Sequence, residues 1–365
     1  MSQPAGVTSS TATRWRLRIS AVVWFVLLVG FLLCLPVLLE ASWVIVAALA
    51  VLALVLAFPA SWAVRRLFRG QRDQRFRTSY LKAFLAAFMC CGIILAAPIF
   101  YLALLPGLRP MTVPQATLSN GSKTVVFQGM MHVGSEGFYK GVVYDLEKAL
   151  SEGYVLYHEG VRPSPEGDQW FSDTLAGGGD LSTNYSLLSD VCGLRFQLDY
   201  FQFLAADMAA RPDRHVVADV TTADMMHEYQ RLVAADPAFA QEMADEAAHS
   251  DEGEANGLAG LVQWIKGATP SQKSLVGTLC RGYFTWALGG PTEPSSLDPI
   301  ILDFRNRKLV ERLQAETNLE IYVTYGAEHL PGVLQQLRDI DPAWEIKSIK
   351  WMRAIEAPEE LSGDI

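Results

Sequence analysis

Residues 124–162 read TVVFQGMMHVGSEGFYKGVVYDLEKALSEGYVLYHEGVR, a pattern of strand, helix and strand. Thr124–Phe127 is a short apolar run rich in β-branched residues, which is typical of a buried strand. After Gly153, Tyr154–Tyr157 is a second such run. Between the two runs, apolar residues recur at the spacing of one helical face, at Phe138, Val142, Val143, Leu146 and Leu150. The stretch therefore predicts a β–α–β unit, with Ser135 as the helix N-cap and Gly153 as its end.

Two side chains that could take part in catalysis or ligand binding follow the strands of this unit. His132 comes shortly after the first strand, and Glu159 ends the second. In open parallel sheets, ligands bind in the crevice beyond the carboxyl ends of the strands. We therefore expect His132 and Glu159 to face one site.

The same pattern returns near the C-terminus. Leu319–Tyr325 is another apolar strand, followed by Gly326-Ala327-Glu328-His329. A helical face comes next, at Val333, Leu334, Leu337 and Ile340. A strand–GxxH–helix unit thus occurs twice, ending at His132 and at His329, and a repeated unit carries more weight than either motif alone.

The N-terminal region has the composition of a membrane anchor. Half of the 365 residues are hydrophobic, and the mean hydropathy is +0.18. Residues 19–39, 42–64 and 83–105 contain no charged side chain. Each run is long enough to cross a hydrocarbon core of about 30 Å as a helix. The sequence predicts three transmembrane helices, and a cleaved signal peptide is the alternative for the first run.

The basic residues predict the orientation of these spans. Arg14, Arg16 and Arg18 precede the first span, and residues 65–82 form a basic loop after the second. By the positive-inside rule, both lie in the cytoplasm. The third span then runs outward. The expected organisation is a cytoplasmic N-terminus (1–18), three spans (19–105), a linker (106–115), an extracytoplasmic periplasmic or extracellular α/β domain (116–356) and a disordered tail (357–365).

Net charge divides at the same boundary. Residues 1–105 hold 10 basic and 2 acidic side chains, so +8, and the remaining residues hold 20 and 37, so −17. A strongly acidic domain repels a phosphate backbone, which excludes nucleic acid as a partner. The bilayer is the expected partner of the spans.

The five cysteines fall into two groups. Cys34, Cys90 and Cys91 lie in the predicted spans, where cysteine acts as a small apolar residue. Cys192 and Cys280 lie in the outer domain, in a compartment that permits disulfides. Either these two form a bridge or both are buried thiols.

The rest of the outer domain supplies further elements. We expect a glycine-rich surface loop over residues 163–186 and a helix over 196–210. A strand over 215–220 ends at Asp219, which either joins the site or satisfies backbone amides at the turn. Thr221 and Asp224 have the spacing of a capping box. Asp298 is the predicted N-cap of a helix that carries Arg305 and Asn306.

Two histidines and a carboxylate can hold a catalytic divalent metal with open positions for water or substrate. The metal hypothesis assigns His132, His329 and Glu159 as ligands. Arg305 would then be a fixed positive charge for a developing oxyanion or for a substrate carboxylate. Gly129 and Gly326 would let backbone amides approach the ligand. The alternative is that the histidines are hydrogen-bonded structural residues.

The order of these motifs resembles the TraB/GumN/Tiki family. The resemblance covers residues 124–340 and excludes the spans. It implies a two-repeat α/β fold, and it assigns site positions to both GxxH histidines, Glu159, Arg305 and Asn306. For the Tiki branch it implies a membrane-tethered metalloprotease that uses manganese or cobalt rather than zinc. Met130 occupies a position where the family usually has threonine. The ChaN-like relatives of this family bind haem.

The sequence therefore predicts a membrane-anchored, metal-dependent hydrolase, a peptidase acting on an extracytoplasmic peptide or protein. The alternative is a non-enzymatic binding or signalling module that takes haem or a peptide in the same crevice. A third interpretation is that the motifs only hold the two repeats together. The oligomeric state is not predicted.

Overall fold

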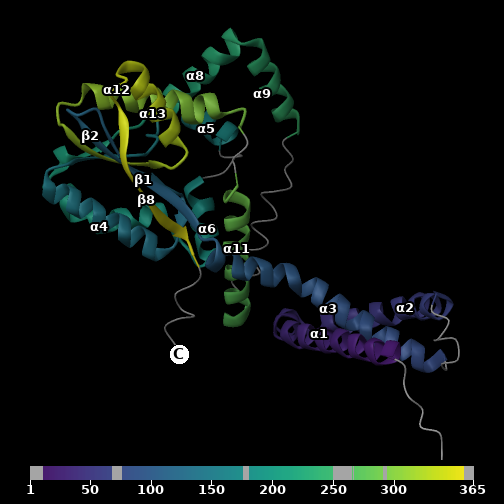
Figure 1. The fold of residues 1–365 in the computed structure, drawn as a ribbon. Helices are drawn as coiled ribbons and strands as arrows, with labels where there is room; N and C mark the ends of the chain where they lie inside the picture. The colour runs from purple at the N-terminus through teal and green to yellow at the C-terminus, as the bar shows by residue number, and fades with distance from the viewer. Residues whose placement is uncertain are drawn as a thin grey trace, which may run out of the picture. The chain divides into compact units, whose positions relative to one another are not determined.

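The computed structural model describes residues 11–67, 76–175, 181–249, 265, 267–290 and 294–356. The chain forms two compact units, Met1–Ala103 and Leu104–Ile365 (Figure 1).

The first unit is helical and apolar. It consists of α1 (Thr11–Ala41), α2 (Trp43–Leu67) and most of α3 (Phe76–Leu108). All three helices are long and apolar enough to cross a membrane. Large apolar side chains on them are exposed, which suits contact with lipid rather than water. The prediction of three helices of membrane-spanning length is confirmed.

The second unit is built on a mixed sheet of six strands in the order β6-β4-β7-β2-β1-β8. Strands β6, β4, β7 and β2 run parallel, β1 pairs antiparallel with β2, and β8 pairs antiparallel with β1. The strands are β1 (Met111–Ser119), β2 (Thr124–Met130), β4 (Val155–His158), β6 (His215–Val217), β7 (Glu320–Gly326) and β8 (Glu345–Ile355). A small second sheet pairs β3 (Val133–Gly134) with β5 (Arg195–Phe196).

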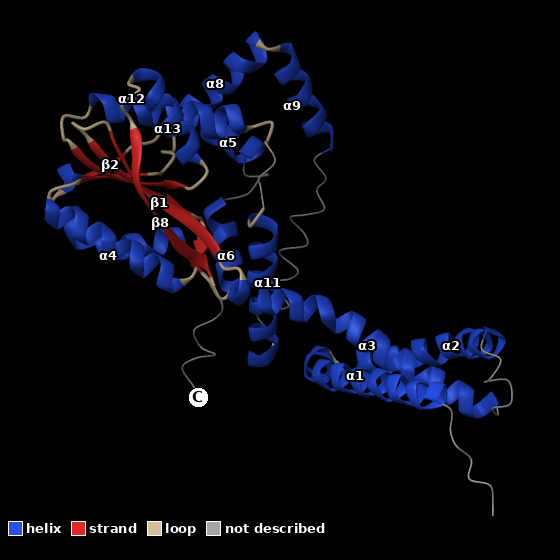
Figure 2. Cartoon of the chain, viewed as in Figure 1, coloured by secondary structure: helices blue, strands red, loops and turns tan. Residues whose placement is uncertain are grey.

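Helices cover both faces of the large sheet (Figure 2). Helix α4 (Glu136–Glu152) packs on one face, and α12 (Arg305–Ala315) and α13 (His329–Ile340) pack on the other. The remaining α-helices are α5 (Asp168–Leu175), α6 (Leu181–Cys192), α7 (Phe201–Ala210), α8 (Thr222–Ala235), α9 (Pro237–His249) and α11 (Pro270–Leu288). A π-helical turn over Pro299–Phe304 leads directly into α12.

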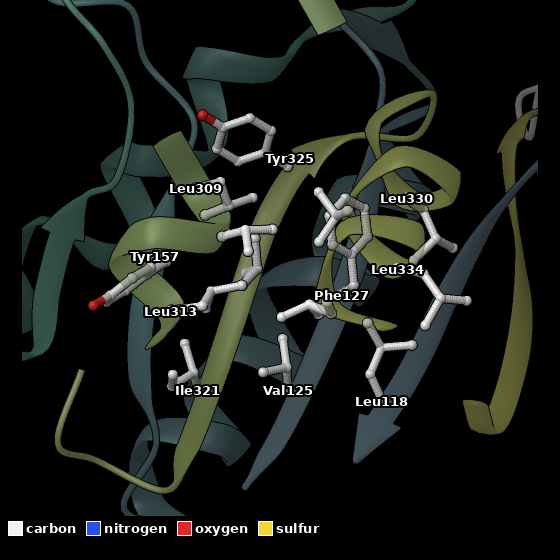
Figure 3. Packing of buried hydrophobic residues seen from close by; sticks show 14 of the residues in the cluster. Leu118, Val125, Phe127, Tyr157, Leu309, Leu313, Ile321, Tyr325, Leu330 and Leu334 are labelled. Carbon is white, nitrogen blue, oxygen red and sulfur yellow. The ribbon is translucent and has the colours of Figure 1, made fainter. Parts of the chain in front are cut away.

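Strand alternation produces the two cores. Along β7, Ile321, Val323 and Tyr325 face α12 and α13, whereas Tyr322 joins the core under α4. Figure 3 shows side chains of α12 and α13, among them Leu313 and Leu334, packed against the strand residues. Fully burying such a side chain contributes roughly 1.5–3 kcal/mol. These cores fix the sheet whose strand ends carry the site.

The predicted start and end of helix α4, which follows His132, are confirmed. The Ser135 hydroxyl accepts a hydrogen bond from the Phe138 amide at the start of α4. Gly153 ends α4 with φ of 101°, a conformation that favours glycine. The capping box of Thr221 and Asp224 is also present.

The two strand–GxxH–helix units differ in detail. Helix α13 begins at His329 itself, whereas β3 separates His132 from the start of α4. Strands β2 and β7 pair in parallel, so the two motifs leave the sheet at neighbouring positions. A two-repeat origin of the fold stays a prediction.

Three sequence predictions need correction. The expected linker, 106–115, comprises the end of α3 and the start of β1, and Pro114 lies within that strand. The expected loop over 163–186 contains α5 and the start of α6. Its glycines 177–179 lie outside the described residues. Asp298 is at the N-cap position with Pro299 after it, but its side chain makes no capping bond; its carboxylate accepts from the Ser295 amide, and the segment that follows is a π-helical turn.

The disulfide hypothesis is confirmed. Cys192 at the end of α6 is bonded to Cys280 in α11, with their Cα atoms 5.1 Å apart. The bridge closes a loop of 88 residues in sequence separation. It joins α11 covalently to α6.

Candidate functional site

The site lies where three parallel strands end. Glu159 directly follows β4, Asp219 lies two residues beyond β6, and Gly326 ends β7. The neighbouring strands bring these positions together although they are far apart in the sequence. Such a row of carboxyl ends is where open α/β sheets bind ligands.

The Arg305 guanidinium joins the two carboxylates. Its Nη2 donates to Glu159 Oε1 at 2.7 Å and to Asp219 Oδ2 at 2.6 Å, and its Nε donates to Asp219 Oδ1 at 3.0 Å. Arg305 is only 7% exposed. Because Nε and Nη2 are fixed by short charge-assisted bonds, the position of the remaining nitrogen, Nη1, is fixed as well.

The Arg305 Nη1 atom makes only long contacts. It lies 3.4 Å from His329 Nε2 and 3.5 Å from the Ile301 carbonyl. Ile301 belongs to the π-helical turn that precedes α12. Turns of this kind are frequent at functional sites, because they change the direction of the following side chains.

Both carboxylates are also held by backbone amides. The Gly326 amide donates to Glu159 Oε2 at 2.7 Å, and the Gly160 and Val220 amides donate to Asp219 at 3.0 and 2.8 Å. Burial alone would raise the pKa of Glu159, but the Arg305 guanidinium and His329 outweigh it, so the pKa lies below its ordinary value. Burial and Arg305 act on the pKa of Asp219 in the same way, with the same net lowering. The pair of carboxylates is therefore charged, and Arg305 carries the only positive charge bonded to it in the described part of the chain.

His329 is fixed as a neutral imidazole. Its Nδ1 lies 2.7 Å from Asn306 Oδ1, so Nδ1 carries the hydrogen and Nε2 the lone pair. Burial, and next the Arg305 charge, lowers the pKa of His329 to about 4. A Cβ at Gly332 would collide with the Asn306 amide, so glycine at this place in α13 makes room for the residue that orients His329.

His132 reaches the same site from the β2 side. Its ring stacks on Tyr185 with 4.3 Å between centroids, and its Nδ1 lies 3.0 Å from Gln197 Nε2. The side chain remains exposed, whereas His329 is buried. Partial desolvation by the surrounding protein lowers the pKa of His132, and the nearby Glu159 opposes this. His132 is therefore an accessible imidazole that is mostly neutral at pH 7.

A pocket of about 410 Å³ joins these groups. His132, Glu159, Arg305 and His329 line it together. Most of the other walls are apolar side chains, among them Met111, Val113, Met131, Leu188, Phe284, Leu288, Ile301 and Ile355. An apolar pocket with a few convergent polar groups is the usual form of a small-molecule or side-chain binding site.

The structure brings together most of the predicted site residues. Gly326 lines the pocket and donates its amide to Glu159, as its predicted role requires. Asn306 acts on the pocket through His329. Gly129 is different: a Cβ there would meet the Pro114 carbonyl oxygen at 2.8 Å, so close packing of β1 explains this glycine.

Sequence reasoning left Asp219 open between a site role and a turn role, and the structure gives it both. It missed Tyr185 and Gln197, which hold His132. Tyr185 lies in the stretch interpreted as a loop, so no helical pattern was available to place it. Gln197 is a neutral amide with no motif around it.

The predicted metal ligands already have hydrogen-bond partners or a charged neighbour in this arrangement. Both oxygens of Glu159 already accept hydrogen bonds, and His329 Nε2 faces the Arg305 guanidinium. Among the described residues, no three His, Cys, Asp or Glu side chains are arranged to hold a metal ion. A cation bound at His329 would lie against a fixed positive charge, so this donor arrangement does not fit a divalent metal. The metal set His132, His329 and Glu159 stays a prediction, as does haem binding.

Comparisons with known proteins do not indicate a family for this chain. No protein-family model, curated protein or solved structure matches the chain.

Proposed function

We propose that the second unit is a membrane-anchored hydrolase that cleaves a peptide or other acyl bond next to an apolar group. The observation that carries this proposal is the fixed Arg305 guanidinium, whose Nη1 makes only long contacts in a pocket that also holds the accessible His132. A preorganised positive donor and a neutral imidazole in one pocket are the two components of water-driven acyl hydrolysis.

Arg305 is suited to stabilise an oxyanion. Its charge is secured by Glu159 and Asp219, which keep its pKa well above the ordinary value although burial opposes this. A substrate carbonyl oxygen next to Nη1 would gain a charge-assisted hydrogen bond as negative charge develops on it. Loss of one such donor costs about 10²–10³ in rate in well-studied hydrolases.

His132 is suited to be the general base. A base works best when its pKa lies near the operating pH, and His132 is closer to this than the buried His329 with its pKa of about 4. As a base, His132 carries its hydrogen on Nδ1, with the Gln197 amide turned so that its oxygen accepts that hydrogen, and Nε2 then holds the lone pair that takes the proton. His329, oriented by Asn306, acts as a positioning residue for Arg305.

The reaction balances without a further reactant. A water oxygen forms a bond to the carbonyl carbon while His132 takes its proton, and the carbonyl electron pair moves to the oxygen beside Arg305. The oxyanion then returns that pair and the bond to the leaving group breaks. His132 gives its proton to the leaving nitrogen or oxygen, so the base is regenerated.

Turnover of fluorogenic peptides and acyl esters with apolar side chains tests the proposal on the full-length chain in detergent micelles. We expect His132→Gln and Arg305→Met each to lower kcat/KM by about 10²–10³. His227→Gln is the matched control, because His227 is an exposed histidine on α8, paired with Glu166. The proposal fails if no substrate in either class is cleaved, or if His132→Gln has full activity.

The same assay distinguishes the metal hypothesis from the route through Arg305 and His132. Activity that survives a chelator supports the route through Arg305 and His132. Activity that is lost with the chelator and restored by manganese would support His132, His329 and Glu159 as ligands. Binding of the probe peptides without cleavage, or a Soret band on haem titration, would favour the binding-module alternative.

A further inference from the structure

The C-terminal turn of α11 has an exposed face without charge. No charged residue occurs from Gly282 to Gly290. Within this stretch Tyr283, Trp286 and Leu288 are 53%, 60% and 46% exposed. A soluble surface rarely presents two large aromatic side chains and a leucine together without a partner.

This turn is also one wall of the pocket. Phe284, Ala287, Leu288 and Gly290 line the cavity. Ala287 and Leu288 are exposed as well, so they form part of the rim rather than the floor. The disulfide between Cys192 and Cys280 fixes this wall to α6. The exposed face and the pocket entrance therefore belong to one rigid segment.

One residue of the pocket wall lies close in sequence to the end of α3. Met111, another residue of the pocket wall, comes three residues after Leu108, the last residue of α3. Three extended residues span at most roughly 11 Å. The stretch from Ala83 to Leu108 carries no charge, and Arg109 is the first charged residue after it. The pocket is thus tied to the point where a membrane-length helix ends.

Tyrosine and tryptophan are the residues enriched at membrane–water interfaces, where an apolar ring lies in lipid and its polar atom reaches water. We propose that the rim face of α11, made of Tyr283, Trp286, Ala287 and Leu288, contacts the headgroup region of the bilayer that α3 enters. The occupant of this face is the lipid surface. If the proposed hydrolase function holds, the pocket then receives substrates that are partitioned into that surface.

A photocrosslinking experiment tests the contact without any need for activity. Benzoylphenylalanine replaces Trp286 in the full-length chain, reconstituted in nanodiscs of phosphatidylcholine and phosphatidylglycerol. The same probe at Tyr144, an aromatic residue of α4 that is 67% exposed, is the matched control. We expect a lipid adduct on the peptide containing position 286 and none at position 144, by mass spectrometry.

Two results would overturn the proposal. One is lipid crosslinking at position 286 that is no greater than at position 144. The other is a crosslink from position 286 to a second copy of the chain, which would make this face a protein interface. A melting temperature equal to that of the unmodified chain ensures that either result concerns the folded protein.

A separate kinetic measurement tests whether the lipid contact affects KM for a vesicle-bound substrate. Trp286→Ser should raise KM for an acylated, vesicle-bound form of the fluorogenic peptide by about tenfold, or roughly 1.4 kcal/mol. The value of kcat, and KM for the water-soluble peptide, should not change. An equal rise for both peptides would contradict the membrane role while leaving the hydrolase proposal intact.

Discussion

His329 and His158 are two buried histidines that the fold holds neutral. Burial is the largest cause in both cases, followed by Arg305 for His329 and by His215 for His158, and it lowers the pKa of each to about 4 from 6.5. Between pH 6.5 and pH 4 the unfolded chain takes up these protons and the folded chain does not. Stability is therefore complete above pH 6.5 and falls as the pH drops toward 4, by about 3 kcal/mol per histidine at most. Glu159 and Asp219 add their own loss only at lower pH, because their pKa values lie below the ordinary ones.

The measurement is the free energy of unfolding as a function of pH. Replacing either buried histidine with glutamine should flatten the profile between pH 6.5 and pH 4. His227→Gln, at the exposed histidine of α8, should leave the slope unchanged. Identical slopes in all variants would show that the buried histidines do not carry the effect.

At the residue scale, many of the site residues could be predicted from the sequence. Glu159 was found because a carboxylate at the end of an apolar strand is costly unless it is paired or used, and His329 because the strand–GxxH–helix unit occurs twice. The hydrogen bonds that join the site residues could not be predicted from the sequence. The Arg305 to Asp219 bond joins residues 86 apart in sequence, and it depends on the π-helical turn that directs the arginine inward. No periodicity in the sequence distinguishes that turn from an α-helical one.

Helix α11 is held as a pocket wall by its covalent bond to α6 and by packing and a hydrogen bond from Arg281 to the Gly193 carbonyl. Its link to α6 closes a loop of 88 residues, and such a bridge typically contributes about 2–4 kcal/mol, mainly by restricting the unfolded chain. Cys192→Ser together with Cys280→Ser should therefore lower the melting temperature of the second unit. Substrate affinity should also fall, because Phe284 and Leu288 lose their fixed place.

Thiol counting provides the control for this prediction. In denaturant, three of the five cysteines should react before reduction, namely Cys34, Cys90 and Cys91, and all five should react after it. Five reactive thiols before reduction would refute the bridge. Cys91→Ser, at a free cysteine of α3, should leave the melting temperature of the second unit unchanged.

At the element scale, the sequence predicted elements whose pattern is periodic and missed those whose pattern is not. The β2–α4–β4 unit and β7 were recognised from apolar runs with clear ends. Strand β8 was not, because its first seven residues are exposed and show no alternation of apolar and polar side chains. Strand β1 contains Pro114, which lacks a backbone donor and marked the segment as a linker.

The membrane region was the most predictable part of the whole molecule. Inside a bilayer every backbone group must be satisfied within the helix, so a long uncharged run has few alternatives. The orientation rests on a different argument, the basic residues Arg14, Arg16 and Arg18 before the first span and the basic loop 65–82 after the second. Basic loops stay in the cytoplasm, whereas acidic domains cross with little penalty. The disulfide agrees with an outer location, since such bonds persist in oxidising compartments.

Labelling of intact cells tests this orientation. An odd number of spans places the two ends of the chain on opposite sides, so one cysteine on each side is sufficient. With the three free cysteines replaced by alanine, Ser151→Cys on α4 should react with a membrane-impermeant maleimide. Thr13→Cys, at the start of α1, should react only after the cells are permeabilised, because three arginines hold that end inside. The opposite pattern would place the pocket in the cytoplasm, where the bridge to α11 would be reduced and the lipid face would meet the inner leaflet. Labelling of both positions in intact cells would mean that one of the three helices does not span.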